Sequence, residues 1–233
     1  MVTSMGVVPF ADEPRRLILP TFANGRAAAR EFVFATAMYE SGDWESAPLV
    51  PANLIDSIAR YTSVPVAPRG VYVALSSNEI FDYPLLWLTG HLPVRFTDAE
   101  RRGVQRYVER GGLLVIDDHN HDVDGVFHKS AWQEIARAFG PTALQKLPNE
   151  HDLYFTFFKF RDGPPSTSHE LNGWGDNLVH RYLHAVTVSG RIGLLYSSKD
   201  YSSEWNFHPD TKRFMAVDPT RFGVNLVVYA LTR

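Results

Sequence analysis

The most informative absence in this sequence is cysteine, which does not occur among its 233 residues. The chain therefore has no disulfide, no thiolate zinc site, no iron–sulfur cluster and no cysteine nucleophile. Long apolar runs are also missing, since none approaches the roughly 18 residues that a membrane-spanning helix needs. The first residues have neither the basic nor the continuous apolar region of a secretory leader. We expect a soluble chain without a signal as given, periplasmic or membrane-associated if a leader was removed.

Charge of either sign is not in excess, because 23 basic and 26 acidic side chains give a net charge of -3. No basic block offers a track for a phosphate backbone, so nucleic acid is not an expected partner. The composition, 45% hydrophobic and 21% charged, is that of a globular chain with a substantial core. From the length and the pattern below we expect an N-terminal extension over residues 1–30 and a single α/β domain over residues 31–233.

Short apolar runs alternate along the chain with segments of helical periodicity. Strands are predicted over 31–39, 71–75, 85–89, 113–116, 153–160, 184–188 and 192–196, and helices over 51–61, 98–110 and 129–139. Loops are predicted over 161–176 and 200–205, whereas 222–231 fits either a helix or a last strand.

The best-marked helix lies between two of the apolar runs. Thr97 and Glu100 form a capping-box pattern at its start, and Gly111 with Gly112 ends it. Strand, capped helix and strand make a βαβ unit, whose two strands should be parallel neighbours. Because the apolar runs do not alternate with polar residues, they indicate a sheet covered on both faces. We predict a three-layer α/β fold with a mostly parallel sheet and helices on both faces.

Polar side chains follow the two strands of this unit at the point where each strand ends. His91 follows the first run, and Asp117, Asp118, His119 and His121 follow the second. In an open parallel sheet, ligands bind outside the carboxyl ends of the strands. Such a cluster could ligate a divalent metal, or could hold an acid–base pair without one. The alternative is that the aspartates cap the next segment and the histidines are solvated loop residues.

Further candidates lie at other strand ends or in loops, where binding residues concentrate. Ser197 or Ser198 could act as a nucleophile with His151 or His184 as its base, although a Ser-Ser pair at a strand end is more often turn chemistry. Asp200 and Trp205 lie in a segment that could contact a ligand. The ligand-pocket candidates are therefore His91, Asp117, Asp118, His151, Ser197, Asp200 and Trp205. The candidate metal ligands are His91, Asp117, His119 and His121.

The order of several motifs carries a family resemblance. The motifs include Gly42-Asp43-Trp44, Leu88-Thr89-Gly90-His91, Gly111-Gly112 before Asp117-Asp118, Tyr196-Ser197 before Asp200 and Trp205, and Gly223-Val224-Asn225. In this order the chain resembles the bacterial family known as domain of unknown function 4159. The resemblance implies the class I glutamine amidotransferase-like or ThuA-like fold, a flavodoxin-like α/β layer. It also implies a protein partner, a MoxR-type ATPase or a von Willebrand A-domain protein, because such proteins are often encoded beside family members.

Three functions follow from these observations. The first is a non-catalytic, amidotransferase-like module that binds a small ligand or a protein partner in a larger bacterial assembly. It is favoured because amidotransfer in that fold uses a cysteine, and because the common catalytic motifs are absent as well. The second is a metal-dependent hydrolase, in which the Asp/His cluster holds a divalent metal that activates water. The third is carbohydrate binding, with Trp44, Trp174 and Trp205 stacking on a sugar ring.

Overall fold

A computed structural model describes residues 31–206 and 217–233, so the expected extension over residues 1–30 lies outside the described residues. Its sheet has seven strands in the order β2-β1-β3-β4-β7-β6-β5. The strands are β1 (Ala35–Met38), β2 (Val71–Ala74), β3 (Leu85–Gly90), β4 (Leu113–Asp118), β5 (Gln145–Lys146), β6 (His184–Val188) and β7 (Arg191–Ser197). The first five in this spatial order are parallel, whereas β6 and β5 are antiparallel to their neighbours. The sheet is therefore mixed.

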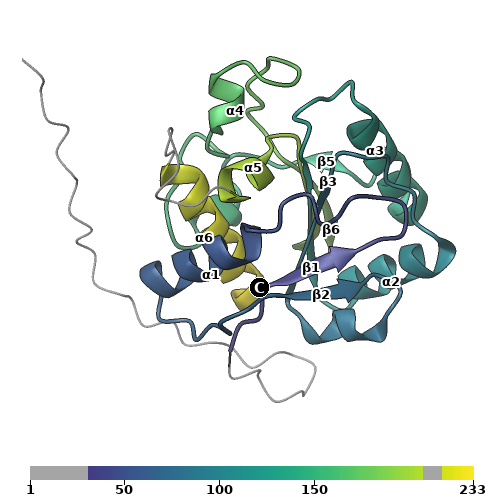
Figure 1. Ribbon diagram of the computed structural model, residues 1–233, viewed down its shortest axis with the longest axis horizontal. Helices are drawn as coiled ribbons and strands as arrows, with labels where there is room; N and C mark the ends of the chain where they lie inside the picture. Colours follow the sequence, from purple (N-terminus) through teal and green to yellow (C-terminus); the bar gives the residue numbers. More distant parts are fainter. Residues whose placement is uncertain (1–30, 207–216) are drawn as a thin grey trace, which may run out of the picture.

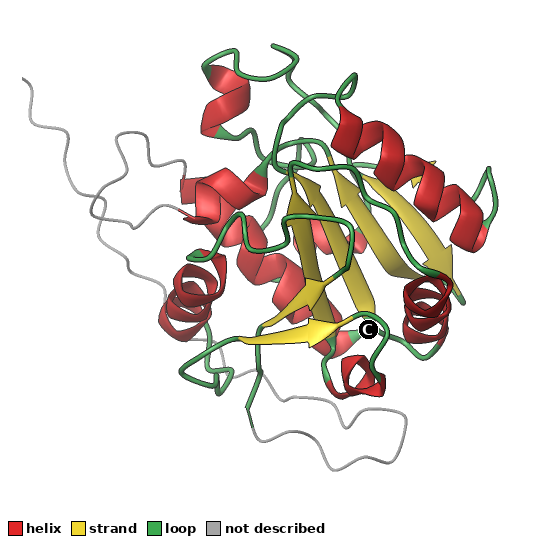
Figure 2. Ribbon diagram, turned by 45° about the vertical axis from the view of Figure 1, so that its right-hand side comes forward, coloured by secondary structure: helices red, strands yellow, loops and turns green. Residues whose placement is uncertain are grey.

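Helices cover both faces of this sheet, which gives the three layers expected from the sequence (Figure 1). The α-helices are α1 (Val50–Tyr61), α2 (Asp98–Glu109), α3 (Val126–Phe139), α4 (Ser168–Leu171), α5 (Tyr201–Asn206) and α6 (Val217–Thr232). Two 3₁₀ helices, η1 (Asn78–Asp82) and η2 (Asp152–Phe155), complete the described elements. One face packs against α1, α5 and α6, and the other against α2 and α3 (Figure 2). None of the described helices combines the length and apolar character that crossing a bilayer requires.

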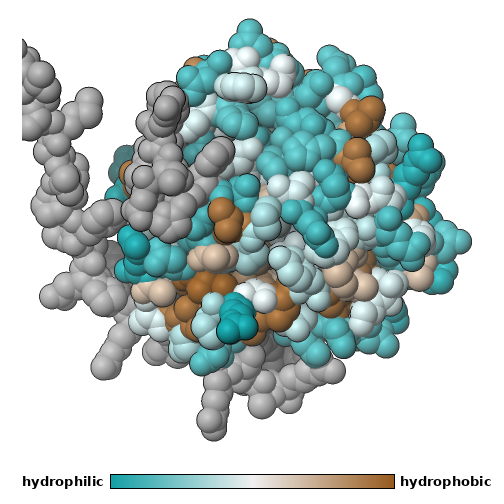
Figure 3. All heavy atoms as spheres, viewed as in Figure 1, coloured by the Kyte–Doolittle hydropathy of each residue, from teal (hydrophilic) through white to brown (hydrophobic). Residues whose placement is uncertain are grey.

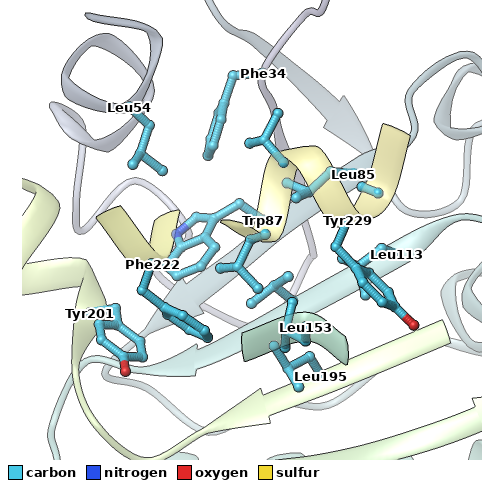
Figure 4. Close-up of a cluster of buried hydrophobic side chains, with 14 of the residues drawn as sticks. Phe34, Leu54, Leu85, Trp87, Leu113, Leu153, Leu195, Tyr201, Phe222 and Tyr229 are labelled. Carbon is cyan, nitrogen blue, oxygen red and sulfur yellow. The ribbon is translucent and has the colours of Figure 1, made fainter. Parts of the chain in front are cut away.

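Alternating residues of the central strands enter two separate cores. On the α6 side, Trp87 of β3 packs against Trp205, with ring centroids 4.9 Å apart. Figure 4 shows this core, in which Phe222 and Tyr229 of α6 lie over the strand side chains. The core on the α2 and α3 side is formed by the intervening strand residues. Burial on both faces explains why these strands are continuously apolar. The face shown in Figure 3 is largely hydrophilic, with hydrophobic residues mainly in the lower half of the view and a few at the upper right.

The βαβ prediction is confirmed. Strands β3 and β4 are parallel neighbours, and α2 lies between them in sequence. The side chain of Thr97 accepts a hydrogen bond from the Glu100 amide at 3.2 Å, and the Glu100 carboxylate accepts one from the Thr97 amide at 2.8 Å. This reciprocal pair satisfies two amides that have no partner within the helix.

Two of the secondary-structure predictions are wrong, one open choice between helix and strand is resolved, and one predicted loop contains a short helix. Residues 153–160 are not a strand but η2 followed by bends and a turn, which pack aromatic side chains beneath α6. Residues 200–205 are not a loop, because α5 begins at Tyr201, and Asp200 accepts a hydrogen bond from the Ser203 amide at 2.9 Å. Residues 222–231 are helical. The predicted loop 161–176 contains the single-turn helix α4.

A test of the packing is offered by Gly103, which lies in the middle of α2. Alanine at a helix interior position is normally more favourable than glycine by about 1 kcal/mol. Here a Cβ atom at Gly103 would lie 2.0 Å from the carbonyl oxygen of Leu75, so the helix would have to move away from the sheet. We expect Gly103→Ala to lower the free energy of unfolding by about 1–3 kcal/mol in urea titrations. Arg102→Ala, at the exposed neighbouring position, is the control and should change it by less than about 0.5 kcal/mol. A stabilised Gly103→Ala protein would contradict this packing.

Candidate functional site

Three adjacent parallel strands end side by side at one edge of the sheet. The register pairs Thr89 of β3 with Asp117 of β4, and Asp117 with Ser197 of β7. Gly90 pairs with Asp118 in the same way. The carboxyl ends of the strands thus bring together polar residues that are distant in sequence, as expected for the binding edge of an open α/β sheet.

Carboxylates and imidazoles from several segments form a connected group at this edge. We call this group the edge cluster: Asp43, His91, Asp117, Asp118, His119, His169 and Asp200.

Asp43 orients the segment that follows β3. Its Oδ1 accepts hydrogen bonds from the amides of His91 at 2.8 Å and Leu92 at 3.0 Å, and its Oδ2 lies 2.8 Å from Nδ1 of His91. Burial alone would raise the pKa of Asp43, but these hydrogen bonds outweigh burial and lower it. Asp43 is therefore an anion that fixes both the backbone and the ring of His91. Its side chain is 29% exposed and that of His91 is 43% exposed.

His119 lies between the Asp43–His91 pair and Asp200. Its ring stacks on that of His91, with centroids 4.2 Å apart, and its Nδ1 lies 3.1 Å from Oγ of Ser46. Its Nε2 lies 3.8 Å from Oδ1 of Asp200. Burial lowers the pKa of His119, and the Asp200 charge opposes this only in part. A neutral imidazole is therefore favoured here.

Asp200 adopts a left-handed backbone conformation, with φ of 56°, that is uncommon for residues other than glycine. Its Oδ2 lies 2.5 Å from Nδ1 of His169, and this contact raises the pKa of His169. Strained conformations of this kind persist only where the surroundings fix them, and they concentrate at functional sites. The conformation places the Asp200 carboxylate between two imidazoles.

Asp117 is buried at the end of β4. Its Oδ2 accepts hydrogen bonds from the amide and the hydroxyl of Ser202, both at 2.7 Å, whereas no hydrogen bond of ordinary geometry reaches Oδ1. Burial, and then the charge of Asp200, raise the pKa of Asp117 to about 7, although Ser197 and Ser202 counteract part of the effect. This carboxyl group therefore titrates near neutral pH.

Asp118, the next residue, is also buried and has a raised pKa. Its Oδ1 accepts a hydrogen bond from the Asn120 amide at 3.0 Å, and no hydrogen bond of ordinary geometry reaches its buried Oδ2. Burial is the main cause that raises the pKa of Asp118 to about 8, and the charge of Asp117 adds to it. Two adjacent carboxyl groups thus titrate near neutral pH, and perturbed pKa values of this kind are typical of functional sites.

A family model described as a domain of unknown function, DUF4159, matches residues 33–231. This chain belongs to the DUF4159 family. The matched range contains the whole edge cluster, so the cluster is part of the family domain and not of an added segment. No functionally curated protein matches the chain.

Most of the ligand-pocket candidates lie at the edge of this DUF4159 domain, but two do not. His151 caps η2, where its Nδ1 accepts a hydrogen bond from the Leu153 amide at 3.1 Å. Its ring faces Tyr229, whose hydroxyl contacts the start of β7, so His151 lies away from Ser197 at the end of that strand. His151 is therefore not the partner of Ser197, whereas His184, the other candidate base, pairs in register with Tyr196 next to Ser197. Trp205 is 1% exposed and packs within the core against Trp87 and Tyr201.

The four expected metal ligands are also not brought together. His91 and His119 stack on each other, and Asp117 is occupied by Ser202. His121 turns away from them, because its φ of 50° directs the ring toward Ser198 and the segment around Leu178. Among the described residues, these four side chains therefore do not form one close group of ligand atoms.

The residues that sequence reasoning missed are Asp43, His169 and Ser202. Asp43 lies in the Gly42-Asp43-Trp44 turn, which the sequence marks only as a turn and as one of the motifs that carry the family resemblance. His169 lies in a stretch without a motif, and it reaches the cluster only because residues 161–183 fold back over the strand ends. We call residues 161–183 the covering segment; it includes α4.

A buried ion pair holds the covering segment in place. Nζ of Lys199 lies 2.7 Å from both carboxylate oxygens of Glu170 and donates to the carbonyl oxygen of His180 at 2.6 Å. Both ionic side chains are fully buried. Because Lys199 precedes Asp200, the same contact that fixes the covering segment also fixes the strained turn beneath His169.

Proposed function

We propose that this DUF4159 domain is a non-catalytic, ligand-binding module with a flavodoxin-like fold of the class I amidotransferase-like, ThuA-like type. The order β2-β1-β3-β4-β7 of its parallel strands supports the fold, because flavodoxin-like sheets have the order 2-1-3-4-5. Such sheets bind ligands where the strand order reverses, which here lies between the ends of β1 and β3. Asp43 follows β1 and His91 follows β3, so the accessible part of the edge cluster lies at this position.

The observation that carries the proposal is the pair of buried carboxyl groups at Asp117 and Asp118. Each has one oxygen that no ordinary hydrogen bond reaches, whereas buried polar atoms in native proteins are nearly always paired. A carboxyl group that titrates near neutral pH can accept from or donate to a hydroxyl or amine group, so a polyol or an amine is the ligand class that we favour. The accessible groups that such a ligand would meet first are His91, Asp43 and His169.

A non-catalytic role is favoured because neither cysteine nor Ser197 offers an activated nucleophile. The chain has no cysteine. Ser197 accepts a hydrogen bond from the Lys199 amide at 3.1 Å, which is turn chemistry.

The variant His91→Gln tests the ligand site. Thermal unfolding would be followed with a panel of polyamines and monosaccharides as probes. We expect at least one probe to raise the Tm of the wild-type protein but not of His91→Gln, because the ring that Asp43 orients is lost. His151→Gln, at a histidine outside the cluster, should respond like the wild type. A panel without any effect on the wild type, or with equal effects on His91→Gln, would refute this site.

Carbohydrate binding is the second candidate, and Trp174 favours it. Its side chain is 64% exposed and stacks on His169 with centroids 5.8 Å apart, so an aromatic surface adjoins the edge cluster. Trp205 is buried and Trp44 packs on Tyr72, so neither of them is a stacking platform of this kind. We expect a monosaccharide that binds to quench tryptophan fluorescence in the wild type and not in Trp174→Ala. Quenching that survives in Trp174→Ala would contradict this candidate.

A protein partner remains part of the proposal. Five large apolar side chains of the covering segment are exposed: Leu171, Trp174, Leu178, Val179 and Tyr182. All five lie within the covering segment, and exposed apolar side chains of this size are common in interaction surfaces. A MoxR-type ATPase or a von Willebrand A-domain protein is the partner that the family resemblance suggests, and co-sedimentation with the purified partner would test it.

A further inference from the structure

A second group of metal-binding side chains lies outside the edge cluster. It consists of His121, Asp176 and His180, whose ligand atoms all lie within 4.8 Å of one another. It is the only such group of histidines and carboxylates among residues 31–206 and 217–233. His121 comes from the loop after β4, whereas Asp176 and His180 belong to the covering segment. The side chains are 1%, 6% and 16% exposed, respectively, so the group is almost closed to solvent.

The hydrogen bonds of His121 set its ring for metal binding. Its Nδ1 lies 2.6 Å from the carbonyl oxygen of Ser198, which can only accept, so Nδ1 carries a proton. In the neutral ring, Nε2 then carries the lone pair. Metal-ligating histidines almost always donate their other N–H to a carbonyl or carboxylate in this way.

Atoms that only accept hydrogen bonds surround Nε2 of His121. The carbonyl oxygen of Leu178 lies 3.0 Å from it, and Oδ1 of Asp176 lies 3.5 Å from it. On the other side of the carboxylate, Oδ2 of Asp176 lies 2.9 Å from Nε2 of His180. Two imidazoles, a carboxylate and a carbonyl oxygen therefore converge from almost buried positions.

The spacing of these atoms matches the first shell of a small transition-metal ion. Ligands about 2.1 Å from one ion, at angles of roughly 90–110°, lie about 3.0–3.4 Å from one another. The separations from Nε2 of His121 to the Leu178 oxygen (3.0 Å) and to Oδ1 of Asp176 (3.5 Å) are close to this range, and so is the 2.9 Å from Nε2 of His180 to the other oxygen of Asp176, Oδ2. Two imidazoles favour Zn²⁺ over Ca²⁺ or Mg²⁺, which prefer oxygen ligands.

The backbone around the group is fixed by other contacts, so the ligands are preorganised. The Asp176 amide donates to the carbonyl oxygen of His121 at 2.8 Å, and Gly175, with φ of 64°, approaches that oxygen so closely that a Cβ atom would lie 1.9 Å away. The His180 amide donates to Glu170 at 2.8 Å. We propose that His121, Asp176 and His180, with the carbonyl oxygen of Leu178, form a Zn²⁺ site that fastens the covering segment to the loop after β4.

This inference does not depend on the ligand-binding function, and its test uses no organic ligand. The full chain, purified without a histidine tag, would be loaded with Zn²⁺, dialysed and analysed for metal by elemental mass spectrometry. We expect one zinc per chain in the wild type and a loss of at least about 100-fold in affinity for His180→Gln. Co²⁺ in place of Zn²⁺ should give a visible absorption band in the wild type that His180→Gln lacks.

The control is His151→Gln, which changes a histidine that caps η2 and should bind zinc like the wild type. If His180→Gln does not give the wild-type circular dichroism spectrum, Asp176→Asn takes its place with the same expectation. The alternative state of the same atoms is free of metal, with His121 and His180 held only by their contacts with Asp176 and the carbonyl oxygens. A wild-type protein that retains no zinc, or a ligand variant that retains as much as the wild type, would show that state and overturn the site.

Discussion

Replacing Lys199 with methionine should destabilise the protein by about 3–5 kcal/mol, the largest loss that we expect from a single change. The Lys199 ammonium contacts both oxygens of the Glu170 carboxylate, and both side chains are fully buried. Burial lowers the pKa of Lys199, although the Glu170 charge counteracts the effect, so the charged pair depends on close contact. Methionine keeps the length and apolar stem of the side chain but leaves a buried carboxylate without its cation.

Urea unfolding at neutral pH measures this effect. Lys129→Met is the matched control, because Lys129 is 59% exposed in its 3.5 Å pair with Asp124 and should contribute less than about 1 kcal/mol. The double variant Lys199→Met with Glu170→Gln should regain part of the loss, because no unpaired charge remains buried. A loss in Lys199→Met no larger than in Lys129→Met would show that the pair does not fasten the covering segment.

The elements predicted correctly from the sequence are those whose signals are local. The capping box at Thr97 and Glu100 and the glycines after α2 act within a few residues of the helix ends. Continuous apolar runs predicted β3 and β4, because each of these strands is buried on both faces. The positions of His91, Asp117 and Asp118 at neighbouring strand ends followed from this parallel pair.

The parts that failed depend on contacts between residues far apart in sequence. The aromatic run after Leu153 has the composition of a strand, but Asn225 of α6 binds its backbone instead. The Asn225 side-chain amide donates to the carbonyl oxygens of Leu153 and Phe158 at 2.9 Å, and its oxygen accepts from the Phe158 amide at 2.8 Å. These bonds span 67 and 72 residues, so no local pattern contains them.

The four predicted metal ligands do not lie together, for a related reason. Extended backbone after β4 would have placed His119 and His121 on one side, but a left-handed conformation at His121 separates them. The ring then finds its partners in the covering segment, at Leu178 and Asp176, which carries no recognisable motif. The sequence places His121 in the loop after β4, but no local pattern indicates that this loop contacts the covering segment.

Asp118→Asn should stabilise the protein at alkaline pH and leave it little changed at mildly acidic pH. The pKa of Asp118 is raised from its ordinary value to about 8, so the native state holds a proton that the unfolded chain releases near pH 4. Stability from this group is complete below about pH 4 and is lost as the pH rises toward and through about 8. The shift corresponds to a loss on the order of 5 kcal/mol in the wild type.

Asparagine cannot ionise, yet its oxygen can still accept the hydrogen bond from the Asn120 amide. The difference in unfolding free energy between Asp118→Asn and the wild type should therefore be small at pH 5 and grow to about 3 kcal/mol or more at pH 9. Asp124→Asn, at an 89% exposed carboxylate in the same loop, should show no such growth. Urea titrations of the three proteins at pH 5 and pH 9 measure this difference. The same pH dependence in all three proteins would contradict the prediction, because it would mean that Asp118 is ionised in the native state. Its second oxygen would then already have a partner in solution.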